Sequence, residues 1–143
     1  MTTIADLFEI VPADDKPCKL AGLFLGQSSD VGDAAEEILR VKIIRGHTTS
    51  GSVGTAAPTP RPVNPNDAAA GFTAEVANTT IALGGTPVNL HSDAFNIRTG
   101  LQLWWPPECR PGVNQGNTSL VVRLMDIPLD ALLMSGTIYI EEE

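Results

Sequence analysis

The feature that most constrains this chain is a two-residue alternation of apolar and polar side chains, repeated in short stretches between turn residues. Alternation with this period is typical of half-buried β-strands, whereas a helix places apolar residues every three or four positions. The chain has 13 glycines and 11 prolines among its 143 residues, and both types favour turns and interrupt helices. The sequence therefore predicts an all-β fold of about eight strands, an antiparallel β-sandwich or jelly roll.

The expected strands follow from these alternations and from the turns between them. They are residues 4–11, 18–26, 36–45, 71–77, 79–83, 86–91, 95–105, 118–127 and 134–142. Asp33 could also cap a helical turn over residues 34–37, which would lead into the third strand. Gly84-Gly85 is expected to form a hairpin turn, and residues 91–93 are expected to form a turn before the long strand.

A proline-rich segment, residues 47–70, interrupts the strand pattern. Its prolines alternate with other residues and favour an extended backbone without internal hydrogen bonds. A structureless loop of about 24 residues is uncommon inside a compact domain. We therefore expect residues 1–143 to form one sandwich domain, with 47–70 as an extended arm that is either disordered or held in place by a neighbouring molecule. The expected interface residues of the arm are Pro58, Pro60, Arg61, Pro62 and Pro65.

The charge of the chain limits its partners. Nine Lys and Arg stand against 17 Asp and Glu, which leaves a net charge of -8, and the few cations are scattered, so nucleic-acid binding is disfavoured. No apolar run approaches ~20 residues, so no membrane span is expected. The start of the chain lacks a basic region followed by an apolar stretch, so we expect no export signal and two reduced cysteines, Cys18 and Cys109. Neighbouring acidic residues, such as 141–143, are expected to be solvated.

The motifs that could carry chemistry are incomplete. Residues 46–54 resemble a phosphate-binding loop but lack its lysine. His91, Ser92 and Asp93 hold the residue types of a hydrolase triad, but a triad brings its members together from separate positions. His47 and His91 are the two histidines, which are too few and too far apart for a cupin-type metal site. We therefore assign no catalytic, cofactor-binding or metal-binding residues, and we expect a non-enzymatic protein.

Trp104 and Trp105 are the most informative local feature. Adjacent residues of a strand face opposite sides of the sheet, so one tryptophan is expected to point inward and the other outward. An exposed tryptophan could stack on a sugar or anchor a protein interface. Alternatively, both side chains could lie in the core or at its edge, because tryptophan is highly buried on average.

Two stretches carry a resemblance to a known class of proteins. Residues 37–62 (EILRVKIIRGHTTSGSVGTAAPTPRP) run from a strand into the arm, and residues 120–142 (LVVRLMDIPLDALLMSGTIYIEE) hold two strands around Pro128. In these the chain resembles small virion structural proteins of tailed bacteriophages, the capsid decoration or cement proteins. The resemblance implies a protein made in the host cytoplasm that sits on the capsid surface, often as a trimer. Its partners would be the major capsid protein and its own copies, braced by the arm.

Two other functions stay open at this point. A carbohydrate-binding sandwich would use Trp104 or Trp105 as its platform. A tail or baseplate component of the same kind of virus would share the fold and the lack of catalytic motifs.

Overall fold

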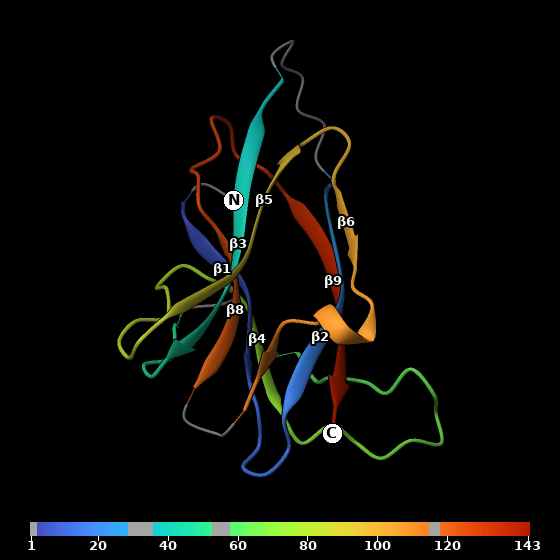
Figure 1. Ribbon diagram of the computed structural model, residues 1–143. Helices are drawn as coiled ribbons and strands as arrows, with labels where there is room; N and C mark the ends of the chain where they lie inside the picture. The colour runs from blue at the N-terminus through green and yellow to red at the C-terminus, as the bar shows by residue number, and fades with distance from the viewer. Residues whose placement is uncertain (1–2, 29–35, 53–57, 115–117) are drawn as a thin grey trace.

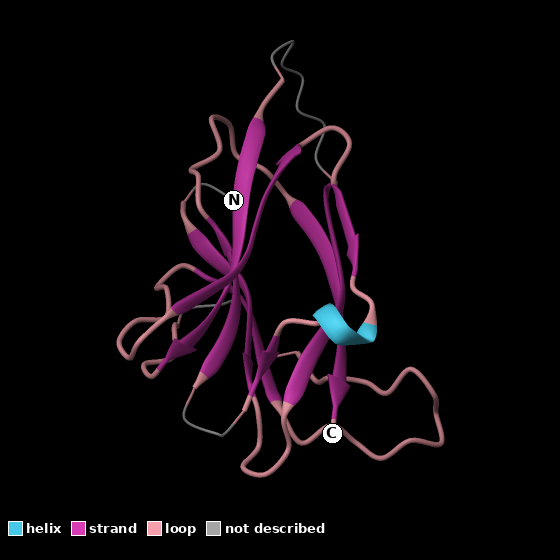
Figure 2. Cartoon of the chain, in the orientation of Figure 1, coloured by secondary structure: helices cyan, strands magenta, loops and turns pink. Residues whose placement is uncertain are grey.

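A computed structural model describes residues 3–28, 36–52, 58–114 and 118–143 of the chain. These residues form nine β-strands and one turn of 3-10 helix, η1 (Pro107–Cys109) (Figures 1 and 2). In chain order the strands are β1 (Ala5–Val11), β2 (Cys18–Gln27), β3 (Ile38–His47), β4 (Thr73–Asn78), β5 (Val88–Asn96), β6 (Leu101–Trp104), β7 (Gly112–Val113), β8 (Ser119–Leu124) and β9 (Met134–Glu142).

The strands form two antiparallel sheets. One sheet has five strands in the order β4-β1-β8-β3-β5. The other, here called the β2 sheet, is centred on β2, which pairs with β9 along one side and with β6 and β7 along the other. The two sheets lie face to face, with β4 and β9 at one edge (Figure 1). This confirms the predicted all-β, antiparallel sandwich.

The core lies between the two sheets and follows the alternation of the sequence. In β3, Leu39, Val41 and Ile43 are buried, whereas Arg40 is exposed. Apolar side chains of this kind are removed from water on both inner faces, which is the main favourable contribution to folding. The largest fully buried apolar side chains are Leu20, Leu23, Leu39, Ile43 and Leu124.

The predicted long strand over residues 95–105 is wrong. Residues 91–93, which were expected to form a turn, lie inside β5, and the chain turns at residues 97–100 instead. Asn96 causes this turn, because its side-chain oxygen accepts the Arg98 N–H at 3.0 Å and its carbonyl accepts the Gly100 N–H at 3.0 Å. Gly100 has a φ of +73°, which glycine adopts without strain. This turn carries the chain from the five-stranded sheet to the β2 sheet.

The predicted strand over residues 79–83 is also wrong. Its backbone makes two single bridges, Thr49 with Leu83 and Ser52 with Thr80. The backbone of Ala82 bonds side chains instead of a neighbouring strand. The Ala82 N–H donates to the Asp6 carboxylate at 2.7 Å, and the Ala82 carbonyl accepts from Arg123 at 2.9 Å.

Residues 48–52 and 79–83, here called the flap, cover part of the outer face of the five-stranded sheet. Ala82 of the flap is buried against Ile44 and Val121 of that sheet. Gly84 and Gly85 have φ values of +77° and +68°, so the chain does turn there, although not between two strands. Of the alternative helical turn, residues 34 and 35 lie outside the described residues, and residues 36 and 37 are not helical.

Candidate functional site

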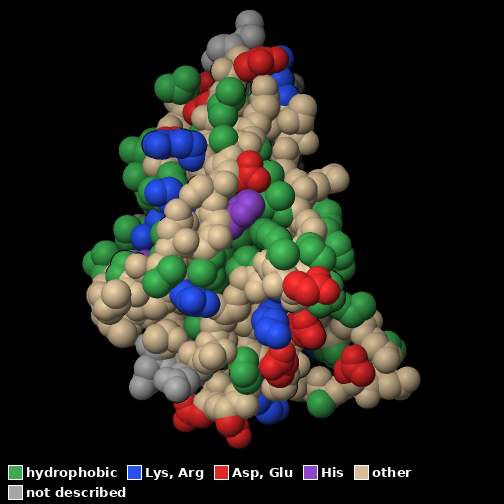
Figure 3. Space-filling model, in the orientation of Figure 1, with side chains coloured by type: hydrophobic (Ala, Val, Ile, Leu, Met, Phe, Trp, Pro, Cys, Tyr) green, Lys and Arg blue, Asp and Glu red, His purple; other side chains and the backbone are tan. Residues whose placement is uncertain are grey.

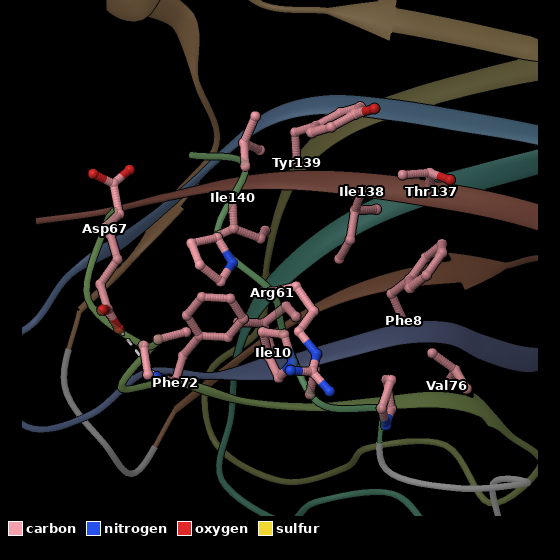
Figure 4. Close-up of a pocket in the computed structure, with 18 of the residues that line it drawn as sticks. Phe8, Ile10, Arg61, Asp67, Phe72, Val76, Thr137, Ile138, Tyr139 and Ile140 are labelled. Carbon is pink, nitrogen blue, oxygen red and sulfur yellow. Dashed lines mark hydrogen bonds between the residues drawn. The ribbon is translucent and has the colours of Figure 1, made fainter. Parts of the chain in front are cut away.

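An apolar pocket of about 820 Å³, here called the edge groove, lies between β4 and β9 at one edge of the sandwich (Figure 4). Among the described residues, β4 pairs with β1 alone and β9 pairs with β2 alone. Each strand therefore leaves one side of its backbone unpaired at this edge, an arrangement that lets another chain add to the sheet. The apolar side chains of the sheets that line the groove are Phe8, Ile10, Phe72, Ala74, Val76, Ile138 and Ile140.

The groove continues the core outward. Phe8, Phe72 and Ile138 pack against the buried cluster but are themselves half-buried. Figure 4 shows Phe8, Ile10 and Phe72 facing Ile138 and Ile140 of the other sheet. The apolar inner faces of the two sheets therefore remain partly uncovered along this edge.

The described part of the proline-rich segment, residues 58–70, runs across the mouth of the edge groove. It is the long loop beside the C-terminus in Figure 1, and it contains no helix or strand. Pro58, Pro60, Arg61 and Pro62 line the groove, and Figure 4 shows the Arg61 side chain among the apolar groups. The fifth expected interface residue, Pro65, does not line it. His47, the first residue of the expected arm, belongs to β3, and residues 53–57 lie outside the described residues.

A carboxylate fastens the C-terminal end of this segment. Glu142, near the end of β9, accepts the backbone N–H of Gly71 at 2.9 Å and that of Phe72 at 3.0 Å. These bonds join β9, on one side of the edge groove, to the residues that lead into β4, on the other side. Because the acceptor is charged, such bonds are among the stronger ones in proteins.

The two neighbouring carboxylates, Glu141 and Glu143, are exposed to solvent, and each also has a cationic partner. Glu141 lies 2.6 Å from Arg110, and Glu143 lies 2.5 Å from the ammonium group of Lys19. The hydrogen bond that Lys19 donates to Glu143, together with the charge of that carboxylate, raises the pKa of Lys19. Acidic and basic side chains lie side by side near the C-terminus in Figure 3. In the sequence, the run of three acidic residues at the end of the predicted strand was the signal that could have indicated these ion pairs.

Three aromatic side chains, Phe24, Trp104 and Tyr139, form a cluster on the outer face of the β2 sheet, here called the aromatic platform. The ring centroids of Trp104 and Tyr139 are 5.8 Å apart, and those of Phe24 and Tyr139 are 5.9 Å apart, both edge-to-face. Trp104 is 62% exposed. A Cβ atom on Gly22 would lie 2.5 Å from the Trp104 ring, so glycine makes room for the indole. The platform is an exposed apolar surface built from three adjacent strands.

Trp105 lies on the other side of the chain from Trp104. It is half-buried, packs against the core and meets the His91 ring edge-to-face at 5.6 Å. Strand alternation predicted that the two tryptophans would face opposite ways, but it left open which one would be outside.

The three residues of the triad-like motif, 91–93, lie in β5. His91 and Asp93 lie on one face of β5, with Nε2 and Oδ2 3.3 Å apart. Ser92 accepts a hydrogen bond from Asn89 at 2.8 Å, and alternation places it on the opposite face. In the described part of the chain, no three His, Cys, Asp or Glu residues gather as metal ligands would. None of the described helical segments has the length and apolarity of a membrane span.

Comparison of the chain with protein-family models, with curated proteins and with solved structures gave no match. The features of the chain that indicate a function are therefore the edge groove, the proline-rich segment and the aromatic platform.

Proposed function

We propose that this chain is a non-enzymatic virion structural protein of the capsid decoration type, which oligomerises and binds the exterior of a capsid through its proline-rich arm. The observation that carries the proposal is the course of residues 58–70, which cross an open, apolar edge of the sandwich without forming helix or strand. Pro60, Arg61 and Val63 all line the groove, yet Arg61 and Val63 stay exposed, Val63 at 83%. Side chains of the segment that lie along the groove are therefore still available to a neighbour.

Physical reasoning supports a docking role for this segment. Its prolines have already lost much of their conformational freedom, so ordering it on a partner costs less entropy than ordering a flexible loop. The unpaired edges of β4 and β9 beside it can accept a further strand. The net charge of -8 suits an outer capsid surface better than an inner one that contacts nucleic acid.

The test is a variant in which residues 58–66 are replaced by Gly and Ser at unchanged length. Because the length of the segment is unchanged, residues 48–52 of the flap, which precede it, should keep their bridges to Thr80 and Leu83. We expect the circular dichroism spectrum to stay β-rich while binding to purified capsids of the virus that encodes the chain falls at least about tenfold. Leu129→Ser, at another exposed apolar position, is the control and should bind normally. Undiminished binding by a folded arm variant would contradict the proposal.

Oligomerisation is measured separately by light scattering. A stable trimer of the intact chain is the expected result, because three copies placed around a capsid symmetry axis could each extend an arm to a neighbour. A monomer at all concentrations would refute the oligomeric part of the proposal. Immunogold labelling of virions distinguishes a head protein from a tail or baseplate component.

A second candidate function, carbohydrate binding, is favoured by the aromatic platform. An exposed indole beside a second aromatic ring is the kind of surface on which a sugar ring stacks. Trp104→Ala should then abolish binding on a glycan array, whereas Ile127→Ala, a similarly exposed control, should not. An array that shows no binding by the intact chain would eliminate this candidate.

A further inference from the structure

A second pocket, of about 470 Å³, lies on the outer side of the five-stranded sheet, away from the edge groove. Its walls come from β1, β3, β8 and residues beside them. They are Glu9, Val11, His47, Thr48, Ser50, Thr118 and Ser119. Polar side chains therefore dominate its lining. Its volume is in the range of small-ligand sites.

Three of these polar side chains are more than nine-tenths buried, and each has an atom without a hydrogen-bond partner. They are Glu9, His47 and Ser119, which are 1%, 6% and 3% exposed. The unpartnered atoms are Glu9 Oε1, His47 Nε2 and Ser119 Oγ. His47 and Ser119 are directly opposite each other on β3 and β8. Leaving a buried polar atom unpaired is costly, so three such atoms on residues of one pocket indicate a site that forms hydrogen bonds with a group from outside the chain.

The hydrogen-bonding roles of these atoms follow from their neighbours. His47 Nδ1 lies 3.3 Å from the carbonyl of Gly84, which can only accept, so Nδ1 carries the hydrogen and Nε2 of the neutral ring is an acceptor. Glu9 Oε2 accepts the Gly51 N–H at 3.0 Å, and Oε1 is a second carboxylate acceptor. The Ser119 hydroxyl can also accept. Three of the residues that line the pocket thus each carry an unpartnered acceptor atom.

The surroundings of the pocket are negatively charged. One amide nitrogen, Asn78 Nδ2, donates both to Glu9 at 2.9 Å and to Glu75 at 2.7 Å, so two carboxylates share it. Within the described ranges neither carboxylate forms a salt bridge, whereas nearby Asp6 is paired with Arg123 at 2.6 Å. A buried carboxylate without a counter-charge is costly, and a bound cation would offset that cost.

We propose that this pocket binds a primary ammonium group. Such a group supplies a positive charge and three N–H donors and has no acceptor, which matches three acceptors in a negative environment. A structural zinc ion would need about four ligands, chiefly Cys and His, and the described residues offer no group of three. Thr48 and Ser50 of the flap form part of the wall, and solvent does not reach the three acceptor atoms, so the ligand enters as the flap shifts. This inference is independent of the virion proposal.

The test uses the two histidines as reporters in NMR spectra of the full chain. On titration with n-butylammonium chloride we expect saturable shifts of the His47 ring signals, while the His91 signals stay unchanged. Tetramethylammonium, which has the charge but no N–H donors, should leave both rings unchanged. Glu9→Gln, which keeps the shape of the side chain, should weaken binding about tenfold or more, and Ser119→Ala should weaken it by less.

Several outcomes would overturn the proposal. These are the absence of any His47 shift, equal responses to both cations, and undiminished binding by folded Glu9→Gln. Equimolar zinc chloride that shifts His47 and is not displaced by butylammonium would assign the pocket to a metal. If the amine binds, comparison with Nα-acetyl-lysine N-methylamide distinguishes the sources: tighter binding of the lysine derivative indicates a lysine side chain of a partner, and tighter binding of butylammonium indicates a free amine.

Discussion

Cys18 and Cys109 carry the same thiol in opposite surroundings. Cys18 begins β2 and is fully buried, whereas Cys109 ends η1 and is exposed. Burial, followed by the charge of Glu142, raises the pKa of the Cys18 thiol from 9.0 to about 11. The thiolate is the reactive form of cysteine, so position in the fold decides which of the two thiols is available.

We predict that Ellman's reagent labels one thiol per native chain at pH 8, at Cys109. At that pH the thiolate fraction of native Cys18 is about a hundredfold below that of the same thiol in the unfolded chain, and burial blocks access as well. Because the native pKa is raised, the associated stability is present below pH 9 and is lost as the pH rises through about 11. Rapid labelling of Cys18 in the folded chain, checked with Cys109→Ser, would refute this prediction.

Among the structural elements, β4 and β9 form the open edge of the sandwich without pairing with each other. Their connection is the carboxylate of Glu142, which accepts the N–H groups of Gly71 and Phe72. The free edges and the apolar groove between them would invite association with other chains. The proline-rich segment lies across this edge and is fastened there by Glu142.

We predict that Glu142→Ala speeds the hydrogen exchange of the Gly71 and Phe72 amides by about tenfold or more, because hydrogen bonds to a charged group contribute about 1.5–3 kcal/mol. Hydrogen exchange measured by NMR gives the two rates. Glu141→Ala is the matched control: it breaks the ion pair with Arg110 but leaves the Gly71 and Phe72 bonds intact. Equal exchange rates in the two variants would show that Glu142 does not fasten the segment.

At the scale of the whole molecule, the flap adds a partial third layer to the two sheets. A buried ion pair, Asp6 with Arg123, joins the first and eighth strands, and both side chains also bond the backbone of Ala82 in the flap. These residues are far apart in sequence, as are most partners in this fold. Contacts between residues far apart in sequence form slowly. The complete Asp6–Arg123 arrangement therefore requires that β1, β8 and the flap have all come together.

We predict that Arg123→Met lowers the free energy of unfolding by about 3–5 kcal/mol, since it leaves a buried carboxylate unpaired. Arg40→Met, which breaks the exposed pair with Asp126, is the control and should cost no more than about 1 kcal/mol. Arg40, chiefly through its side-chain hydrogen bond, lowers the pKa of Asp126, so its small contribution is present at neutral pH and lost in acid. Urea denaturation at pH 7 measures both, and equal losses would contradict the prediction.

Much of the fold could be predicted because strand alternation is a local property. Leu39, Val41 and Ile43 alternate with charged residues in the sequence and are buried in β3. The errors occurred where side chains compete with backbone pairing: Asn96 turns the chain at residues 97–100, and Asp6 and Arg123 occupy the backbone of Ala82. The partners in the second case are too far apart in sequence for any local pattern to indicate them.

The candidate sites were predicted less completely. The proline-rich segment and the tryptophan pair are visible in composition and alternation, so both were named. Glu142 as a fastening group was missed, as was the meeting of Glu9, His47 and Ser119, because each depends on which strands become neighbours. No residue spacing in the sequence indicates that β1, β3 and β8 will be neighbours in one sheet.

The sequence by itself determined the strand-rich class, most strand positions and the inward residues of β3, because the side-chain period of a strand is set by its own backbone. The tertiary structure alone decided the strand order, the open edge between β4 and β9, the exposure of Trp104 and the polar pocket under the flap. These features arise from contacts between distant segments, whose geometry is set by how the two sheets pack together.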